Sequence, residues 1–205
     1  MKNSKTNQKR NILQIIKIYS VLLLIVLTIN QSEAIVNASN QVSVNVTPVV
    51  QGYSCWCWAA CAEMTGSIIS TNGHRIQSAL VYYIHHSYGN YGATISETAL
   101  AAKYSGYGKK NVTGESNIKY ISFLWNKISD GYPVVAGCFS YNASGNITGS
   151  GHAVEIHKIR YVTNNSGNVY YITYIDPLYG EEEEVPYIDF IMRNNNRYVQ
   201  TAYVD

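Results

Sequence analysis

The spacing of apolar residues changes near Gly131, and this change limits the folds that the chain can adopt. Before Gly131, apolar residues recur at the spacing that places them on one face of an α-helix. After it, apolar and polar residues alternate, which is typical of β-strands. The helical pattern covers residues 57–70, 75–86, 95–105 and 116–131, and the alternating pattern covers residues 133–141, 152–162 and 169–176.

The order of these elements predicts the fold class. Helices come first and strands follow, and turn-rich segments between the strands indicate antiparallel hairpins. We therefore predict an α+β fold in which an N-terminal helical half packs on a C-terminal antiparallel sheet. An earlier alternating run, residues 41–50, predicts a strand or an extended entry segment. Ser96 and Ser116 are predicted to cap the third and fourth helices, and the run Glu181–Glu184 is predicted to be a solvated loop.

Residues 1–34 have the pattern of a secretory signal peptide. A basic head precedes an apolar run at residues 18–29, and Ser32 and Ala34 occupy the small-residue positions of a cleavage site. A single membrane anchor is the alternative, but this run has 12 residues, whereas a spanning helix needs about 20. We predict cleavage after Ala34, no stable membrane anchor after that cleavage, and a secreted domain over residues 35–205.

Removal of residues 1–34 changes the charge of the chain. The whole sequence has 15 Lys and Arg against 13 Asp and Glu, a formal net charge of +2. Five of the basic residues and one acidic residue lie in the predicted signal peptide, so the mature chain has a net charge of about −2. Because the rest of the chain has no basic patch, a nucleic-acid partner is not expected.

Three of the four cysteines, Cys55, Cys57 and Cys61, fall within seven positions. A metal site, a disulfide framework and a reactive nucleophile are the competing interpretations. Structural zinc sites usually have cysteine pairs separated by two to four residues, whereas one residue separates Cys55 from Cys57 and no second pair follows. Four cysteines are also too few to hold together a chain that can bury a core, although one bridge from Cys55 or Cys61 to Cys138 stays open. No metal or other cofactor is expected.

The third interpretation is a nucleophile, Cys57, where the helical pattern begins. A helix N-terminus lowers the pKa of a thiol and so favours the reactive thiolate. Gln51 lies six residues earlier, so a loop can place its amide beside the thiol to form an oxyanion hole with the Cys57 N–H. His152, at the start of a strand, is the predicted base, with His157 in reserve. Asp176 ends the next strand and is predicted to orient the imidazole; its competing interpretation is a residue that starts a turn.

The segments that carry these residues resemble the papain-like cysteine peptidases. The run "QGYSCWCWAA" is similar to their active-site segment, "GHAV" to their histidine strand, and "YIDP" to the segment of their third polar member. The aspartate followed by proline is closer to bacterial members, such as the double-glycine leader peptidases and certain secreted effector proteases, than to papain. The resemblance implies a papain-like fold and a protein or peptide substrate. It implies Gln51 as oxyanion donor, Cys57 as nucleophile, His152 as general acid and base, and Asp176 as orienting partner.

Two other functional classes fit parts of the same sequence. A cell-wall amidase or transamidase would use the same catalytic residues, and the lack of an obvious wall-binding repeat weighs mildly against it. A non-catalytic secreted binding protein would use the 19 tyrosines as its contact surface, but the complete Gln, Cys, His and Asp set weighs against it. The sequence therefore favours a secreted cysteine peptidase. It predicts neither the natural substrate nor the oligomeric state.

Overall fold

The computed structural model describes residues 39–142, 144, 146–149, 151–192 and 196–205. The predicted signal peptide, residues 1–34, lies outside these residues. The chain divides into two units, one made of Met1–Ser39 and Val162–Gly167, and the other of Asn40–Tyr161 and Asn168–Asp205. All candidate site residues belong to the second unit. Among the described residues, no helix combines the length and the apolar character needed to cross a bilayer.

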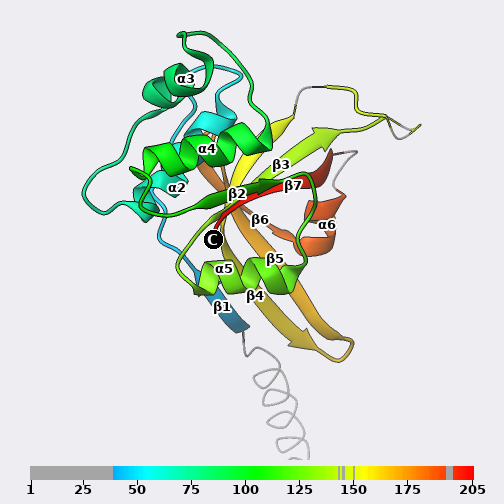
Figure 1. Ribbon diagram of the computed structural model, residues 1–205. Coiled ribbons are helices and arrows are strands. Elements are labelled where there is room, and N and C mark those ends of the chain that lie inside the picture. The colour runs from blue at the N-terminus through cyan, green and yellow to red at the C-terminus, as the bar shows by residue number, and fades with distance from the viewer. Residues whose placement is uncertain (1–38, 143, 145, 150, 193–195) are drawn as a thin grey trace, which may run out of the picture. The chain divides into compact units, whose positions relative to one another are not determined.

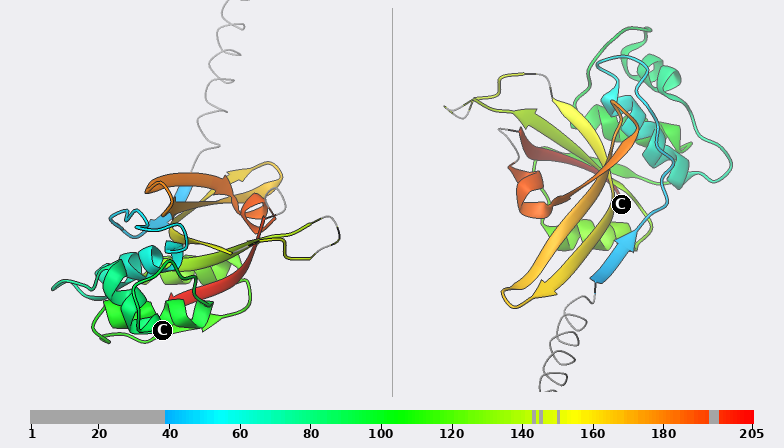
Figure 2. Two further views of the ribbon diagram at one scale, coloured as in Figure 1. Left: turned by 90° about the horizontal axis from the view of Figure 1, so that it is seen from above. Right: turned by 180° about the vertical axis from the view of Figure 1, so that it is seen from behind.

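The described helices agree with the helical half that the sequence predicts. They are α2 (Cys57–Ile69), α3 (Gln77–His85), α4 (Ile95–Ser105), α5 (Ile121–Ser129) and the unpredicted α6 (Tyr187–Ile191). The first three lie together, with α5 and α6 apart from them (Figure 1), and the view from behind keeps this grouping (Figure 2, right). α2 and α4 approach closely at Gly66, where an added Cβ would lie 2.1 Å from Ser105 Oγ. Nearly all of α2 is buried as a result.

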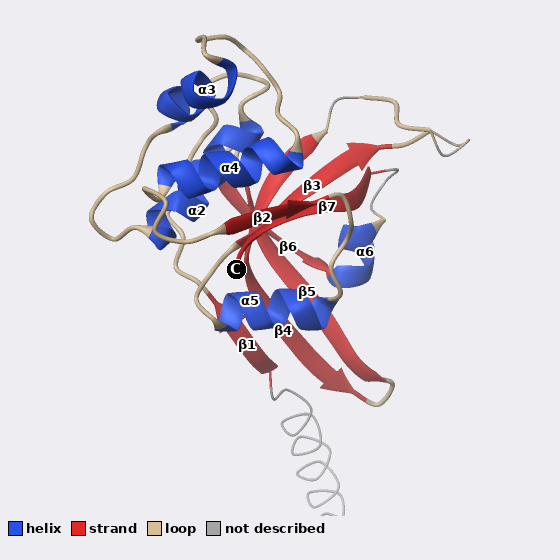
Figure 3. Cartoon of the chain, in the orientation of Figure 1, coloured by secondary structure: helices blue, strands red, loops and turns tan. Residues whose placement is uncertain are grey.

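The strands of the described residues form one seven-stranded sheet, shown in red in Figure 3. They are β1 (Ser39–Ser43), β2 (Val112–Glu115), β3 (Val134–Ser140), β4 (His152–Asn164), β5 (Gly167–Asp176), β6 (Glu181–Pro186) and β7 (Asn196–Val204). Their order is β2-β7-β3-β4-β5-β6, and β1 pairs with β4. The sequence predicts β3, β4 and β5 and an extended segment that overlaps β1, but it misses β2, β6 and β7. The α+β class with an antiparallel sheet is the predicted one, but the order is less simple than predicted: β1 precedes the helices, β2 lies between α4 and α5, and α6 lies between β6 and β7.

The predicted loop at Glu181–Glu184 is wrong, because these residues belong to the edge strand β6. They pair with β5 in antiparallel register, with Glu181 opposite Asp176. Arg160 on β4 donates to the two carboxylate oxygens of Glu184 at 2.8 and 2.6 Å. Charged side chains are common on edge strands, because charge discourages pairing with another chain.

The two predicted helix caps are also wrong. The cap of α4 is Thr94, whose hydroxyl accepts from the Glu97 N–H at 3.2 Å while the Glu97 carboxylate accepts from the Thr94 N–H at 2.7 Å. This capping box leaves Ser96 exposed in the first turn. α5 begins at Ile121 after Tyr120 and has no side-chain cap. Ser116 therefore lies several residues before the helix that it is predicted to cap.

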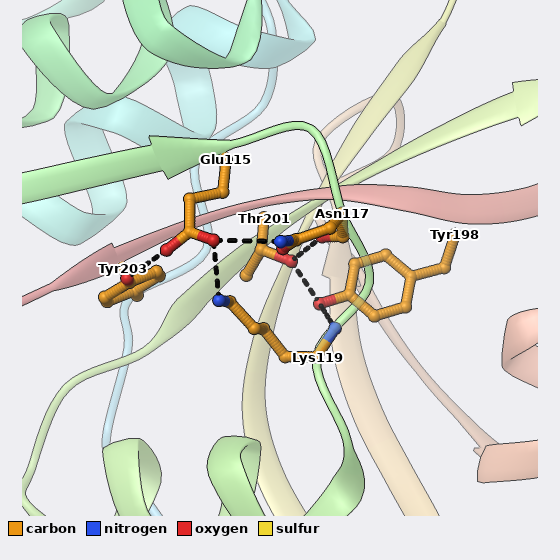
Figure 4. A network of polar contacts seen from close by, with 6 residues as sticks. All are labelled: Glu115, Asn117, Lys119, Tyr198, Thr201 and Tyr203. Carbon is orange, nitrogen blue, oxygen red and sulfur yellow. Dashed lines mark hydrogen bonds and ion pairs between the residues drawn. The ribbon is translucent and has the colours of Figure 1, made fainter.

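Polar contacts with β7 explain why α5 begins late (Figure 4). Thr201 Oγ1 donates to Asn117 O at 2.8 Å, and the Lys119 N–H donates to the Tyr198 hydroxyl at 3.4 Å. The Glu115 carboxylate accepts from Lys119 Nζ at 2.8 Å. The first two contacts use backbone groups of Asn117 and Lys119 that a helix would otherwise pair internally, so the segment between β2 and α5 is not helical.

Strand β4, which supports the site, is buried on both faces. Residues Ala153 to His157 are all buried, although the two faces alternate along the strand. The polar members have partners: Thr65 Oγ1 on α2 donates to Glu155 at 2.7 Å, and His157 Nδ1 lies 3.2 Å from Val44 O. The sheet is therefore covered on both sides at the strand that carries His152.

The pairing of β3 with β7 contains a β-bulge. Gly137 lies opposite Gln200, whereas the next residue, Cys138, lies opposite Tyr198. Val199 is thus an extra residue on β7. A bulge re-aims the side chains beside it and is common next to active sites.

Candidate active site

Helix α2 begins at Cys57 without a side-chain cap. Trp56 is the N-cap residue, and its side chain makes no capping hydrogen bond. A turn in which the Trp56 N–H donates to Tyr53 O at 3.0 Å leads into the helix. The first N–H groups of a helix have no acceptors inside it, and the backbone of Trp58 helps to lower the pKa of the Cys57 thiol. The uncapped end therefore stabilises negative charge on the thiol.

Three hydrogen bonds from the loop between α3 and α4 hold the segment around Cys57. Each joins a loop residue to a residue between positions 55 and 58: Asn90 Oδ1 accepts from the Cys55 N–H at 2.8 Å, Gly89 O from Trp56 Nε1 at 2.8 Å, and Tyr91 O from Trp58 Nε1 at 2.9 Å. Both tryptophan rings are buried. The tryptophans between the cysteines thus anchor the nucleophile segment.

His152 and Asp176 meet because they lie at neighbouring ends of antiparallel strands. His152 begins β4 and Asp176 ends β5, and the imidazole Nε2 lies 2.8 Å from Asp176 Oδ1. The same oxygen accepts from the Leu178 N–H at 2.8 Å, so Asp176 both contacts the histidine and holds a turn. Burial would raise the pKa of this carboxyl, but the two hydrogen bonds and the charge of His152 outweigh burial and lower the pKa.

Cys57 and His152 line the same cavity, and each shifts the pKa of the other. Burial would raise the pKa of Cys57, but hydrogen bonds with His152, the Ala153 N–H and the Trp58 N–H, together with the charge of His152, lower the pKa below its ordinary 9.0. Burial would lower the pKa of His152, but the hydrogen bonds and charges of Asp176 and Cys57 raise that pKa to about 9. Both shifts favour a thiolate–imidazolium pair. Since Nε2 faces Asp176, Nδ1 is the nitrogen that remains for the sulfur.

Gln51 lies in the loop before α2, but its amide is engaged within that loop. Nε2 donates to Tyr53 O at 2.9 Å and to Ser54 O at 3.0 Å. Its Oε1 is buried and has no hydrogen-bond partner among the described residues. The backbone N–H of Gln51 donates to Pro177 O at 2.8 Å, which joins this loop to the turn after Asp176. Gln51 is thus at the border of the site, with both amide hydrogens directed to backbone carbonyls.

All four cysteines are free thiols, so the bridge to Cys138 that the sequence leaves open is not formed. Burial raises the pKa of Cys61 well above its ordinary value. Burial also raises the pKa of Cys138 to about 12. Both thiols are therefore protonated near neutral pH and are weak nucleophiles. Cys55 is partly exposed and lines the same cavity as Cys57.

The reserve base, His157, has a different environment from His152. It is 5% exposed, and its Nδ1 lies 3.2 Å from Val44 O of the N-terminal segment. Within the part of the chain that the structure describes, no cluster of three or more His, Cys, Asp or Glu is arranged to hold a metal ion. The sequence gives no signal for the backbone groups of Trp58 and Ala153 that lower the pKa of Cys57, because the fold and not the residue type places them.

A cavity of about 170 Å³ lies beside Cys57 and His152. Its walls come from the start of α4 and the loop before it, from β3 and from β7. Apolar side chains such as Trp58, Ile95 and Phe139 line it together with three glycines, and none of the described lining residues is Asp, Glu, Lys or Arg. Concave, mostly apolar sites with a few polar groups are typical of ligand binding. The thiolate is therefore next to a space that suits an uncharged group.

The family comparison agrees with this geometry. Residues 40–205 match the model of the Peptidase_C39 like family, which is consistent with the papain-like superfamily that the sequence resembles. No curated protein matches the chain. The matched range covers most of the chain and includes all four candidate residues. The chain therefore belongs to the Peptidase_C39-like family of cysteine peptidases.

Proposed function

We propose that the protein is a secreted cysteine peptidase that hydrolyses peptide bonds through a thioacyl-enzyme. Family membership gives the general activity. The observation that carries the finer assignment is the placement of three side chains: Cys57 and His152 line one cavity, and His152 Nε2 lies 2.8 Å from Asp176 Oδ1. We assign these three residues to a catalytic triad, whose parts a nucleophile of this kind requires.

Each residue has a distinct role in the proposed reaction. In acylation, the Cys57 thiolate attacks the carbonyl carbon of the scissile bond, and the His152 imidazolium gives its proton to the leaving nitrogen. In deacylation, neutral His152 takes a proton from water as the water oxygen attacks the thioester, and Cys57 leaves as thiolate. Asp176 accepts from Nε2–H throughout, which keeps Nδ1 towards the sulfur.

The oxyanion is assigned to the Cys57 N–H and the Gln51 amide. The Cys57 N–H lies at an uncapped helix N-terminus, where such groups bind anions. The Gln51 amide at present donates to two carbonyl groups of its own loop. Donation to an oxyanion would replace one of these bonds, and it would supply charge stabilisation when charge develops.

Secretion is proposed from residues 1–34 of the sequence. The chain purified from the medium of an expressing culture should begin at Ile35, as N-terminal sequencing or intact mass would show. Protein that keeps residues 1–34 would contradict cleavage after Ala34.

Labelling with an epoxide inhibitor of cysteine peptidases tests the nucleophile. Mass spectrometry should find the adduct on Cys57, and Cys57→Ala should neither react nor cleave peptides of a random library. Cys61→Ala should still react, because that thiol is buried and protonated. An adduct on Cys55 with Cys57 unmodified would remove Cys57 as the nucleophile. Cleavage of library peptides would separate a peptidase from a cell-wall amidase.

A further inference from the structure

Two surface segments at the border of the site expose apolar side chains. The exposed fractions of the four residues are large for their type: Val50 55%, Tyr53 58%, Leu178 45% and Tyr179 67%. These four residues are called the apolar patch here. Single exposed apolar residues are ordinary on protein surfaces, but concentrated ones mark interaction sites.

The two segments of the apolar patch are held against each other. The Gln51 N–H donates to Pro177 O at 2.8 Å. The Val50 side chain packs on Gly180, where an added Cβ would lie 2.8 Å from Val50 Cγ2. Gly180 also has a φ of +70°, which favours glycine. Val50 and the turn that carries Leu178 and Tyr179 therefore form one continuous surface.

The backbone of the apolar patch is hydrogen-bonded to the proposed catalytic side chains. The Leu178 N–H donates to Asp176 Oδ1 at 2.8 Å, the same oxygen that contacts His152. The Tyr53 carbonyl accepts from Gln51 Nε2 at 2.9 Å. A ligand that rests on the patch would thus touch the residues next to both the orienting carboxylate and the oxyanion donor.

The apolar patch is separate from the cavity, since none of its four residues lines the cavity. A bound peptide places one side chain in the cavity and its scissile carbonyl at Cys57. The rest of the bound peptide then has to run over a surface other than the cavity. Extended chains advance about 3.3 Å per residue, so a few residues suffice to cross this border. The backbone of the patch is bonded to Asp176 and Gln51, and its four side chains are apolar or aromatic and uncharged, so it suits apolar residues.

We propose that the apolar patch docks the apolar part of the peptide substrate that lies beyond the scissile bond, away from the cavity. This proposal rests on the proposed peptidase function. It predicts that the enzyme selects substrates with apolar residues on one flank of the scissile bond, independently of the side chain that fills the cavity.

The test uses a peptide that the wild type cleaves, chosen from a library, and two versions of it trimmed on one flank or the other. Leu178→Ala and Tyr179→Ala should each lower kcat/KM about tenfold on the full peptide, the change expected for about 1.4 kcal/mol. One of the two trimmed peptides lacks the residues that contact the patch. On that peptide, kcat/KM of the two variants should equal that of the wild type. Ile188→Ala is the matched control, because Ile188 is 65% exposed on α6 and belongs to neither surface.

Two results would overturn the docking surface. Variants that match the wild type on all three peptides would show that the patch binds nothing, and an equal loss on all three would show damage to the catalytic residues. The melting temperatures of the variants should match the wild type and so exclude misfolding. A wild type that cleaves no peptide would overturn the peptidase function itself, and the docking surface with it.

Discussion

Asp176 makes two contacts whose consequences can be separated at the scale of single residues. Asp176 Oδ1 lies 2.8 Å from both His152 Nε2 and the Leu178 nitrogen. An asparagine at position 176 keeps this acceptor oxygen but has no charge. Burial lowers the pKa of His152, and the contacts of Asp176 and Cys57 reverse this effect and raise the pKa to about 9. Asp176→Asn should therefore lower the pKa of His152 while leaving the turn intact.

The sign of the effect follows from the role of each group. The imidazolium donates a proton, so activity is lost as pH rises through the pKa of His152. The thiolate attacks, so activity is lost as pH falls through the lowered pKa of Cys57. A kcat/KM profile of the wild type should be bell-shaped, with its alkaline limb near pH 9, and Asp176→Asn should move that limb to lower pH. The same limb in both proteins would leave Asp176 as a turn residue only.

Gln51 allows a second prediction at this scale. Loss of one oxyanion donor typically lowers kcat by about 10²–10³, so Gln51→Ala should show a loss of that order with little change in KM. Gln77→Ala is the control, because Gln77 holds the same loop through Gly52 N–H and Val50 O, each at 2.9 Å. Steady-state kinetics on one peptide would compare the two variants. Equal losses in both would mean that Gln51 only shapes the loop.

The sequence selects Cys57, His152 and Asp176 from residue type, chain order and the ends of predicted elements. The structure places Cys57 and His152 on one cavity and Asp176 against His152, and the catalytic roles of the three residues stay predictions. The engaged amide of Gln51 depends on loop conformation, and the backbone groups that lower the pKa of Cys57 depend on how α2 and β4 pack. Residue type determines neither. Cys61 and Cys138 show the same limit, because whether two cysteines form a bridge depends on their placement.

At the scale of elements, helix starts are decided by a few hydrogen bonds. Thr94 and Ser96 are both good capping residues two positions apart, and Glu97 decides between them because it lies three residues after Thr94. Thr94→Ala should lower the free energy of unfolding by about 1 kcal/mol. Ser96→Ala, an exposed position in the first turn, should change it by less than about 0.5 kcal/mol. Urea unfolding measures both, and a larger loss for Ser96→Ala would contradict the observed cap.

Strands were harder to predict than helices because their pairing is distant in sequence. β7 lies between β2 and β3 in the sheet, although it is the last strand of the chain. β6 has four consecutive glutamates, a composition that disfavours strands, and it is a strand because β5 offers it a pairing edge. The hydrophobic pattern of the sequence describes one segment at a time, so it does not predict which strands will pair with each other.

At the scale of the whole molecule, Glu155 lies where the helical half meets the sheet. It is fully buried on β4, and Thr65 of α2 donates to it at 2.7 Å. Its Oε2 has no hydrogen-bond partner among the described residues. Burial raises the pKa of Glu155 from 4.5 to about 8, more than the hydrogen bond from Thr65 lowers it. The folded protein therefore holds a proton at this position that the unfolded chain has already lost at neutral pH.

This difference makes the stability of the whole domain depend on pH. The folded pKa is raised, so the contribution of the protonated carboxyl is fully present below about pH 4.5 and is lost as pH rises through about 8. Glu155→Gln keeps an acceptor for Thr65 but does not titrate. Between pH 5 and pH 8, the wild type should lose roughly 3–5 kcal/mol of unfolding free energy relative to this variant. Urea unfolding followed by tryptophan fluorescence at several pH values measures the difference. Glu181→Gln, at an exposed position on β6, is the control and should keep the wild-type dependence of unfolding free energy on pH. If Glu155→Gln also showed the wild-type dependence, the buried carboxyl would be ionised in the folded protein.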